Sequence, residues 1–103
     1  GMTIVTAPDG QSALDIVTEA MKQPETMFQV VVMDVRMPGM DGLETLRHMK
    51  KIAPKLPVLL LTGHASLGVA VQGMDLGAYD YMLKPVAINE LIIKMEEAVR
   101  AAA

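Results

Sequence analysis

The chain is 103 residues long and 51% hydrophobic, which suits one folded domain with a single core and argues against disorder. Its net charge is -3 with Lys and Arg spread along the chain, so no basic patch points to nucleic acid, and the absence of cysteine excludes disulfides and thiolate metal sites. No apolar run approaches the ~20 residues of a membrane span and no signal-peptide pattern opens the chain, so we expect a cytoplasmic domain without a membrane partner.

The first half of the chain contains two predicted strands and two predicted helices. Residues 3–7 are a short β-branched run, which is typical of a strand. Apolar residues from Ala13 to Met21 follow helical spacing and predict an amphipathic helix. Residues 28–33 predict the central strand, because their apolar run is unbroken and turn residues follow it. Apolar residues then step by three over residues 43–52, which indicates a second helix.

The second half of the chain repeats this alternation. Strands are predicted at residues 58–61 and 79–83, and helices at residues 67–76 and 88–99. The helix over residues 67–76 contains Gly68 and Gly73, and each glycine costs roughly 0.8–1 kcal/mol relative to Ala in a helix interior. We therefore expect this helix to be the least stable of the set.

The alternation of strands and helices predicts right-handed βαβ units on a parallel sheet, which is an α/β fold. Three predicted strands lead into polar residues, namely Asp34, Thr62 and Lys84. Because the carboxyl ends of parallel strands lie at one edge of a sheet, where ligands bind in open α/β folds, we expect these three side chains to converge.

Each of these residues also has an ordinary structural interpretation. Asp34 fits a nucleophile, a metal ligand or a plain turn residue. Thr62 fits either an anion ligand or an unremarkable strand end, and Lys84 either points into solvent or pairs with a buried carboxylate. His64 is interpreted as a solvated loop residue, and Tyr81 as a half-buried packing residue. The three strand ends together favour a site more than any one of them does.

Four segments resemble a known family, in the same order and register. They read TAPDGQSAL at residues 6–14, VVMDVRMPGMDG at 31–42, PVLLLTGH at 57–64 and GAYDYMLKP at 77–85. Together they resemble the response-regulator receiver domain of two-component signalling, from Gly1 to about Ala98. The resemblance implies a flavodoxin-like, doubly wound parallel sheet over residues 1–103, as a signalling domain and not an enzyme.

The resemblance also implies a role for each residue at the sheet edge. Asp34 is implied to be the phosphoacceptor, which takes a phosphoryl group from a sensor histidine kinase or a phosphotransfer protein. Lys84 pairs with Asp34 and later with the phosphoryl group, and Thr62 is the switch hydroxyl that binds the phosphoryl oxygens. Tyr81 is the switch aromatic that rotates inward. The Lys84–Pro85 peptide is implied to be cis.

A magnesium ion is the implied cofactor, with the Asp34 carboxylate and the Arg36 backbone carbonyl among its ligands. The family begins with a strand that ends in two acidic residues, followed by a helix, and neither is present in this sequence. We therefore expect a fragment that is incomplete at the N-terminus, although a cloning remnant ahead of a start at Met2 is the alternative. Without the acidic pair we expect Mg²⁺ affinity to be weak or absent and phosphotransfer to be poor.

The missing strand would lie between residues 3–7 and residues 28–33 in the family's strand order 2-1-3-4-5. These two segments therefore either pair directly, or accept a strand from a neighbouring chain, or the first of them detaches. We expect the signal to leave through the helix at residues 67–76 and the strand and helix after it. The partner there is an output domain or a second receiver copy, as in a homodimer.

Two other functions are weighed against the phosphoacceptor receiver. The first is an interaction module with the same fold that works without phosphorylation, which the missing acidic pair favours. The second is a small flavodoxin-like enzyme or mononucleotide binder, which requires a glycine-rich or Ser/Thr-rich phosphate loop after the first strand. Residues 7–10 read APDG and make a poor loop of that kind.

Overall fold

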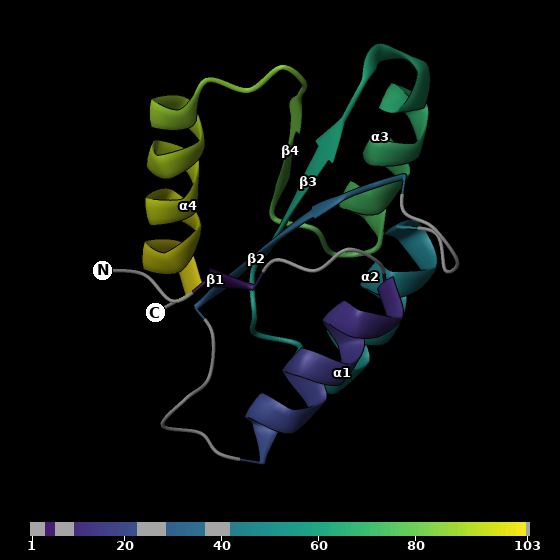
Figure 1. Ribbon diagram of the computed structural model, residues 1–103, viewed down its shortest axis with the longest axis vertical. Helices are drawn as coiled ribbons and strands as arrows, with labels where there is room; N and C mark the ends of the chain where they lie inside the picture. Colours follow the sequence, from purple (N-terminus) through teal and green to yellow (C-terminus); the bar gives the residue numbers. More distant parts are fainter. Residues whose placement is uncertain (1–3, 6–9, 23–28, 37–41, 103) are drawn as a thin grey trace.

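The computed structural model describes residues 4–5, 10–22, 29–36 and 42–102, which form a parallel sheet between two layers of helices (Figure 1). The strands are β1 (Ile4–Val5), β2 (Val30–Asp34), β3 (Val58–Thr62) and β4 (Asp80–Leu83). The helices are α1 (Gly10–Met21), α2 (Gly42–Ile52), α3 (Leu67–Asp75) and α4 (Ile88–Ala102), and the 3-10 turn η2 (His64–Ser66) precedes α3. The predicted order of strands and helices is confirmed, and the α/β class with it.

The four described strands lie in the order β1-β2-β3-β4, and every neighbouring pair is parallel. Strand β1 pairs directly with β2, with Ile4 opposite Val30 and Val5 opposite Val31. Of the three arrangements weighed for the first segment, direct pairing is therefore the one observed. Residues 3 and 6–7 of the predicted first strand, and residue 28 of the predicted central strand, lie outside the described residues.

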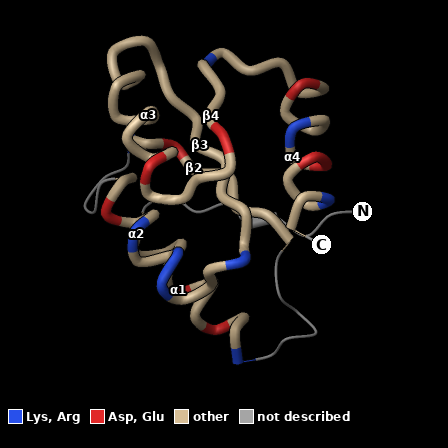
Figure 2. Tube along the Cα trace, turned by 180° about the vertical axis from the view of Figure 1, so that it is seen from behind, with Lys and Arg blue, Asp and Glu red and all other residues tan. Residues whose placement is uncertain are grey.

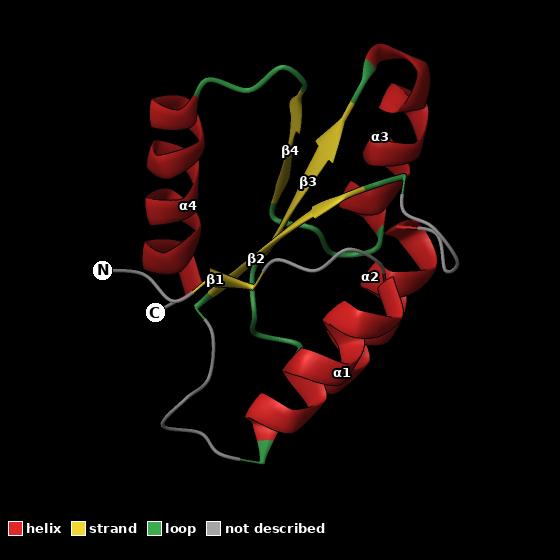
Figure 3. Cartoon of the chain, in the orientation of Figure 1, coloured by secondary structure: helices red, strands yellow, loops and turns green. Residues whose placement is uncertain are grey.

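Helices cover both faces of the sheet, as the doubly wound fold predicts. In Figure 3, α1, α2 and α3 lie on one side of the strands and α4 lies on the other. Alternate residues of a strand point to opposite faces, so Val31 packs in the core beneath α1, α2 and α3, whereas Val30 packs beneath α4. Both valines are at most 1% exposed, as are Val58, Leu59 and Leu60 of β3. The apolar runs of β2 and β3 are therefore buried on both faces, as predicted.

Helix α3 contains both predicted glycines, but they differ in their surroundings. A Cβ atom at Gly68 would have no atom within 4 Å. A Cβ atom at Gly73 would overlap Cδ1 of the fully buried Leu60 and would approach Leu43 to 3.5 Å. The prediction treated both glycines only as weak points, whereas Gly73 also lets α3 pack closely on β3.

An ion pair fastens α4 to the edge strand β4. The ammonium of Lys94 lies 3.0 Å from Asp80 Oδ2 and 3.4 Å from Glu97 Oε2. The hydrogen bond to Asp80, assisted by the attraction between the charges, raises the pKa of Lys94 above its ordinary value.

Figure 2 shows basic and acidic residues interspersed along α2 and α4. Among the described helices, none has the length and apolar character that crossing a membrane requires.

Candidate functional site

The carboxyl ends of β2, β3 and β4 meet at one edge of the sheet. Asp34 lies opposite Leu61 in the parallel register, and Leu61 lies opposite Met82. The backbone N–H of Lys84 donates to the Thr62 carbonyl oxygen at 2.7 Å, so the pairing of β3 with β4 continues one residue beyond the strand. The alignment brings the carboxyl ends of three strands, which are distant in sequence, to one place.

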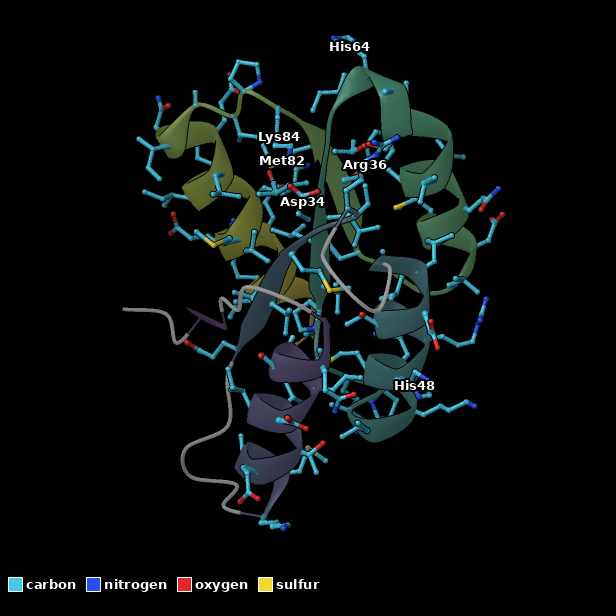
Figure 4. All side chains as sticks on the ribbon, turned by 45° about the vertical axis from the view of Figure 1, so that its right-hand side comes forward. Asp34, Arg36, His48, His64, Met82 and Lys84 are labelled. Carbon is cyan, nitrogen blue, oxygen red and sulfur yellow. The ribbon has the colours of Figure 1, made fainter. Side chains whose placement is uncertain are left out.

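Two of the three predicted side chains meet at this edge. The Lys84 ammonium contacts Asp34 Oδ2, and the Arg36 backbone N–H donates to Asp34 Oδ1 at 2.9 Å. Figure 4 shows Lys84 and Met82 beside Asp34. The Asp34 side chain is 31% exposed and that of Lys84 is 45% exposed, so a reacting group in solution has access to the pair. The Lys84–Pro85 peptide is cis, as the resemblance implied.

The third predicted side chain, Thr62, lies at the same edge but turns away from Asp34. Its hydroxyl lies 3.0 Å from the Gly63 carbonyl oxygen and 3.1 Å from Ser66 Oγ, and within the described chain it has no bond to Asp34 or Lys84. Strand alternation sets the sheet face on which the Thr62 side chain lies, and its rotamer sets where the hydroxyl points. Thr62 lies two residues after Leu60, so its side chain shares with Leu60 the face of the sheet beneath α1, α2 and α3. Asp34 lies four residues after Val30, so its side chain shares with Val30 the face beneath α4. The predicted convergence therefore holds for the carboxylate and the ammonium but not for the hydroxyl.

Ser66 is a residue of this site that the sequence analysis missed. It is 4% exposed, and its hydroxyl contacts that of the fully buried Thr62. Ser66 occupies the N-cap position of α3 but makes no side-chain cap hydrogen bond. The available signal was a serine directly before a predicted helix, and such a serine is ordinarily interpreted as a cap.

The other predicted residues take ordinary positions. Tyr81 is half-buried and packs against the core beneath α1, α2 and α3, which agrees with the packing interpretation. His64 is exposed in η2, and Figure 4 places it and His48 away from Asp34. Neither histidine is positioned to exchange a proton with the Asp34 carboxylate.

The donors for a metal ion at this edge are few. Within the described ranges, no three residues among His, Cys, Asp and Glu are grouped so that they could hold a metal. Both oxygens of Asp34 already accept hydrogen bonds, one from Lys84 and one from the Arg36 backbone. Mg²⁺ requires near-octahedral oxygen ligands, so the described residues do not fit a tightly held Mg²⁺.

Comparison with known sequences identifies the family. Residues 1–96 match the response regulator receiver domain family. The transcriptional regulatory protein FixJ of Bradyrhizobium diazoefficiens is 39% identical over 102 residues, which cover 99% of this chain and 47% of FixJ. The DNA-binding transcriptional regulator NtrC of Escherichia coli is 39% identical over 99 residues, covering 96% of this chain and 20% of NtrC. The chain thus spans less than half the length of these curated relatives.

Solved structures agree with the sequence comparison. A response regulator receiver domain protein from Clostridium thermocellum superposes with a TM-score of 0.83 at 36% identity, covering 94% of this chain and 74% of that one. The receiver domain of NtrX from Brucella abortus gives a TM-score of 0.79 at 34% identity, covering 93% of this chain and 77% of that one. The chain therefore belongs to the response regulator receiver domains, the phosphoacceptor modules of two-component signalling.

Proposed function

We propose that Asp34 is the residue that accepts the phosphoryl group. A carboxylate oxygen of Asp34 attacks the phosphorus of a phosphohistidine, and the P–N bond breaks with its electron pair left on the imidazole nitrogen. The product is an aspartyl phosphate on this chain. The observation that carries the proposal is the contact between Lys84 and Asp34 at an accessible edge of the sheet.

Lys84 supplies the positive charge that this reaction requires. A phosphoryl group adds about -1.5 to -2 charges near pH 7, by analogy with other phosphorylated side chains. The ammonium of Lys84 already contacts the carboxylate that would carry the group, so a small shift of its flexible stem brings it onto a phosphoryl oxygen. Lys84 therefore orients Asp34 before the transfer and neutralises charge after it.

Thr62 and Tyr81 are proposed to be the parts that switch. The Thr62 hydroxyl turns away from Asp34, which fits the unphosphorylated state. Phosphorylation offers this hydroxyl a charged acceptor at Asp34 and so shifts a preformed equilibrium between its two orientations. Tyr81 is half-buried, so part of its ring is exposed and would become buried if the ring rotated inward.

Receiver domains generally bind Mg²⁺ at the phosphorylation site. For this chain we propose weak Mg²⁺ affinity, with the Asp34 carboxylate and the Arg36 backbone carbonyl as its protein ligands. The support is the donor set, because Asp34 belongs to no group of three acidic or histidine residues in the described structure. Rapid phosphorylation in millimolar Mg²⁺ by a small acyl phosphate donor would contradict this part of the proposal.

Receiver domains interact with histidine kinases and output domains. We propose that the surface of α3, β4 and α4 carries the signal, to an output domain or to a second copy of the chain. Helix α3 exposes Val69, Val71 and Met74, which are between 37% and 48% exposed. In Figure 2 the trace of α3 is almost free of charged residues, whereas α4 carries both signs. Exposed apolar side chains on a helix that begins next to the site suit a surface whose binding partner depends on the state of the site.

A second candidate is an interaction module that works without phosphorylation. The observation that favours it is the same poor donor set around Asp34. A beryllofluoride titration distinguishes the two, because beryllofluoride mimics a phosphoryl group bound to a carboxylate. Saturable spectral changes that centre on Asp34, Thr62 and Lys84 support the phosphoacceptor. A spectrum unchanged at high beryllofluoride and Mg²⁺ supports the interaction module.

The direct test measures the site of phosphorylation by intact mass and peptide mapping, with a small acyl phosphate as donor. The substitution Asp34→Asn removes the nucleophilic oxygen, and Asp15→Asn removes an exposed carboxylate of α1 as the matched control. We expect slow, base-labile phosphorylation of the wild type and of D15N, and none of D34N. Equal phosphorylation of D34N would refute the assignment of Asp34.

A further inference from the structure

We propose that Ser66 is a positioning residue that holds the Thr62 hydroxyl away from Asp34 and releases it when Asp34 is phosphorylated. The inference rests on the proposed function, because it assigns the regulation of that site to a residue that touches neither Asp34 nor Lys84. It starts from the contact between two buried hydroxyl groups, those of Thr62 and Ser66.

Three oxygen atoms form a closed triangle beneath the sheet edge. Thr62 Oγ1 lies 3.0 Å from the Gly63 carbonyl oxygen and 3.1 Å from Ser66 Oγ, and Ser66 Oγ lies 3.5 Å from the same carbonyl. Only two hydroxyl protons, one on each side chain, are available for these three contacts. Ser66 Oγ takes part in two of the three contacts. The O–O distances are long for hydroxyl hydrogen bonds, so the triangle holds Thr62 with modest strength and releases it reversibly.

Burial makes the Ser66 contact consequential. Thr62 is 0% exposed and Ser66 is 4% exposed, so water does not readily replace one hydroxyl when the other moves. A buried hydroxyl without a partner costs free energy, so Thr62 leaves the triangle only when another acceptor is offered. A phosphoryl group on Asp34 is an acceptor of that kind.

The backbone around Thr62 is held on both sides. The Thr62 carbonyl oxygen accepts from the Lys84 N–H at 2.7 Å, and the Gly63 carbonyl oxygen accepts from the Ser66 N–H at 3.1 Å. These bonds do not involve the Thr62 hydroxyl, so its rotation does not itself break them. The movement is therefore a rotation about χ1 that turns Oγ1 toward the strand end, while Cβ stays on the face that Thr62 shares with Leu60.

Once the Thr62 hydroxyl leaves, the Ser66 hydroxyl can make a different hydrogen bond, to the first turn of α3. It stands at the N-cap of α3, where a serine oxygen ordinarily accepts a hydrogen bond from a backbone N–H of the first turn, but no such bond is present. Its φ of -115 and ψ of 17 lie outside the extended conformation that N-cap residues usually adopt. When Thr62 turns toward Asp34, the Ser66 oxygen is free to cap α3, which changes the Ser66 backbone and moves the first turn. Ser66 thereby links the chemistry at Asp34 to helix α3.

The experiment compares Ser66→Ala, Ser66→Thr and a control, Thr18→Ala, which removes an exposed hydroxyl on α1. The first measurement uses no ligand: three-bond couplings in NMR spectra report the χ1 rotamers of Thr62. We expect one rotamer in the wild type and in T18A, and averaging over at least two in S66A. The variant S66T retains a hydroxyl and is expected to restore the single rotamer.

The second measurement is a beryllofluoride titration at saturating Mg²⁺. We expect S66A to lower the midpoint by about 2- to 10-fold, the factor that one buried neutral hydrogen bond supports, and T18A to leave the midpoint unchanged. A single Thr62 rotamer and an unchanged midpoint in S66A would overturn the role of Ser66. Failure of every variant and of the wild type to bind beryllofluoride would overturn the proposed function instead, and the rotamer measurement still decides the role of Ser66. If S66A does not fold, Ser66→Cys, which is close in volume and a weak donor, takes its place in both measurements.

Discussion

The Lys84 ammonium contacts the Asp34 carboxylate although 50 positions separate the two residues in the sequence. Asp34 ends β2, Lys84 follows β4, and β3 lies between these strands in the sheet. Neighbouring strands are about 4.8 Å apart, so the four-carbon stem of Lys84 has to extend over the end of β3 to reach Asp34. The pair therefore depends on the alignment of three strand ends.

Loss of this ammonium should slow phosphorylation while leaving the fold intact. A charge-assisted hydrogen bond is worth about 1.5–3 kcal/mol, so Lys84→Met is expected to lower the rate of phosphorylation roughly 10- to 100-fold. Stability should change by no more than about 1 kcal/mol, because the pair is partly exposed. Intact mass against time measures the rate, and Lys55→Met, at an exposed lysine before β3, is the control. Equal rates for the two variants would show that Lys84 has no part in the transfer.

The two glycines of α3 should respond oppositely to alanine. Gly73→Ala places a methyl group against the buried Leu60, and overpacking of this kind costs about 1–3 kcal/mol, offset by roughly 0.8–1 kcal/mol of helix propensity. The two effects together predict a net loss of up to about 2 kcal/mol. Gly68→Ala meets no atom within 4 Å and should gain about 0.4–1 kcal/mol. Urea unfolding measures both, and stabilisation by G73A would show that α3 shifts to make room for the methyl group.

The pair between Lys94 and Asp80 should make stability depend on pH in the alkaline range. Its hydrogen bond raises the pKa of Lys94 above the ordinary 10.5, so the folded state holds this proton more tightly than the unfolded state does. The contribution of the pair to the stability of the fold is fully present below pH 10.5 and is lost as the pH rises through the raised pKa of Lys94. The difference in unfolding free energy between the wild type and Lys94→Met, about 0.2–1 kcal/mol, should therefore vanish at high pH.

Chemical denaturation at a series of pH values between neutral and strongly alkaline checks the pH dependence. The control is Lys51→Met, at an exposed lysine of α2, which is expected to leave stability nearly unchanged throughout. The same difference between the wild type and K94M at every pH would show that the pair does not stabilise the fold by charge.

Amide hydrogen exchange should be faster in α3 than in α1. All nine residues of α3 are described, and two of them, Ala70 and Gly73, are buried. Helix α1 buries five residues, so opening it exposes more apolar surface. Exchange rates measured by NMR or mass spectrometry give the comparison directly. Equal protection in the two helices would contradict the expectation that α3 is the least stable helix of the set.

Much of the fold could be predicted from local patterns in the sequence. The unbroken run from Val30 to Met33 and its counterpart from Val58 to Leu61 predict buried strands, because apolar side chains on both faces require cover on both faces. Polar residues directly after these runs then predict a shared edge, because parallel strands end together. The pairing of Asp34 with Lys84 follows from these two facts together with the family resemblance.

Contacts across the fold decided the remaining features. The packing of Gly73 depends on Leu60, which belongs to another element, so the glycine alone indicated only a weak helix. The direction of the Thr62 hydroxyl depends on the face of β3 that it shares with Leu60 and on Ser66 at the start of α3. A side-chain rotamer is set by the atoms that surround it, and residues distant along the chain supply those atoms only once the sheet and helices have assembled.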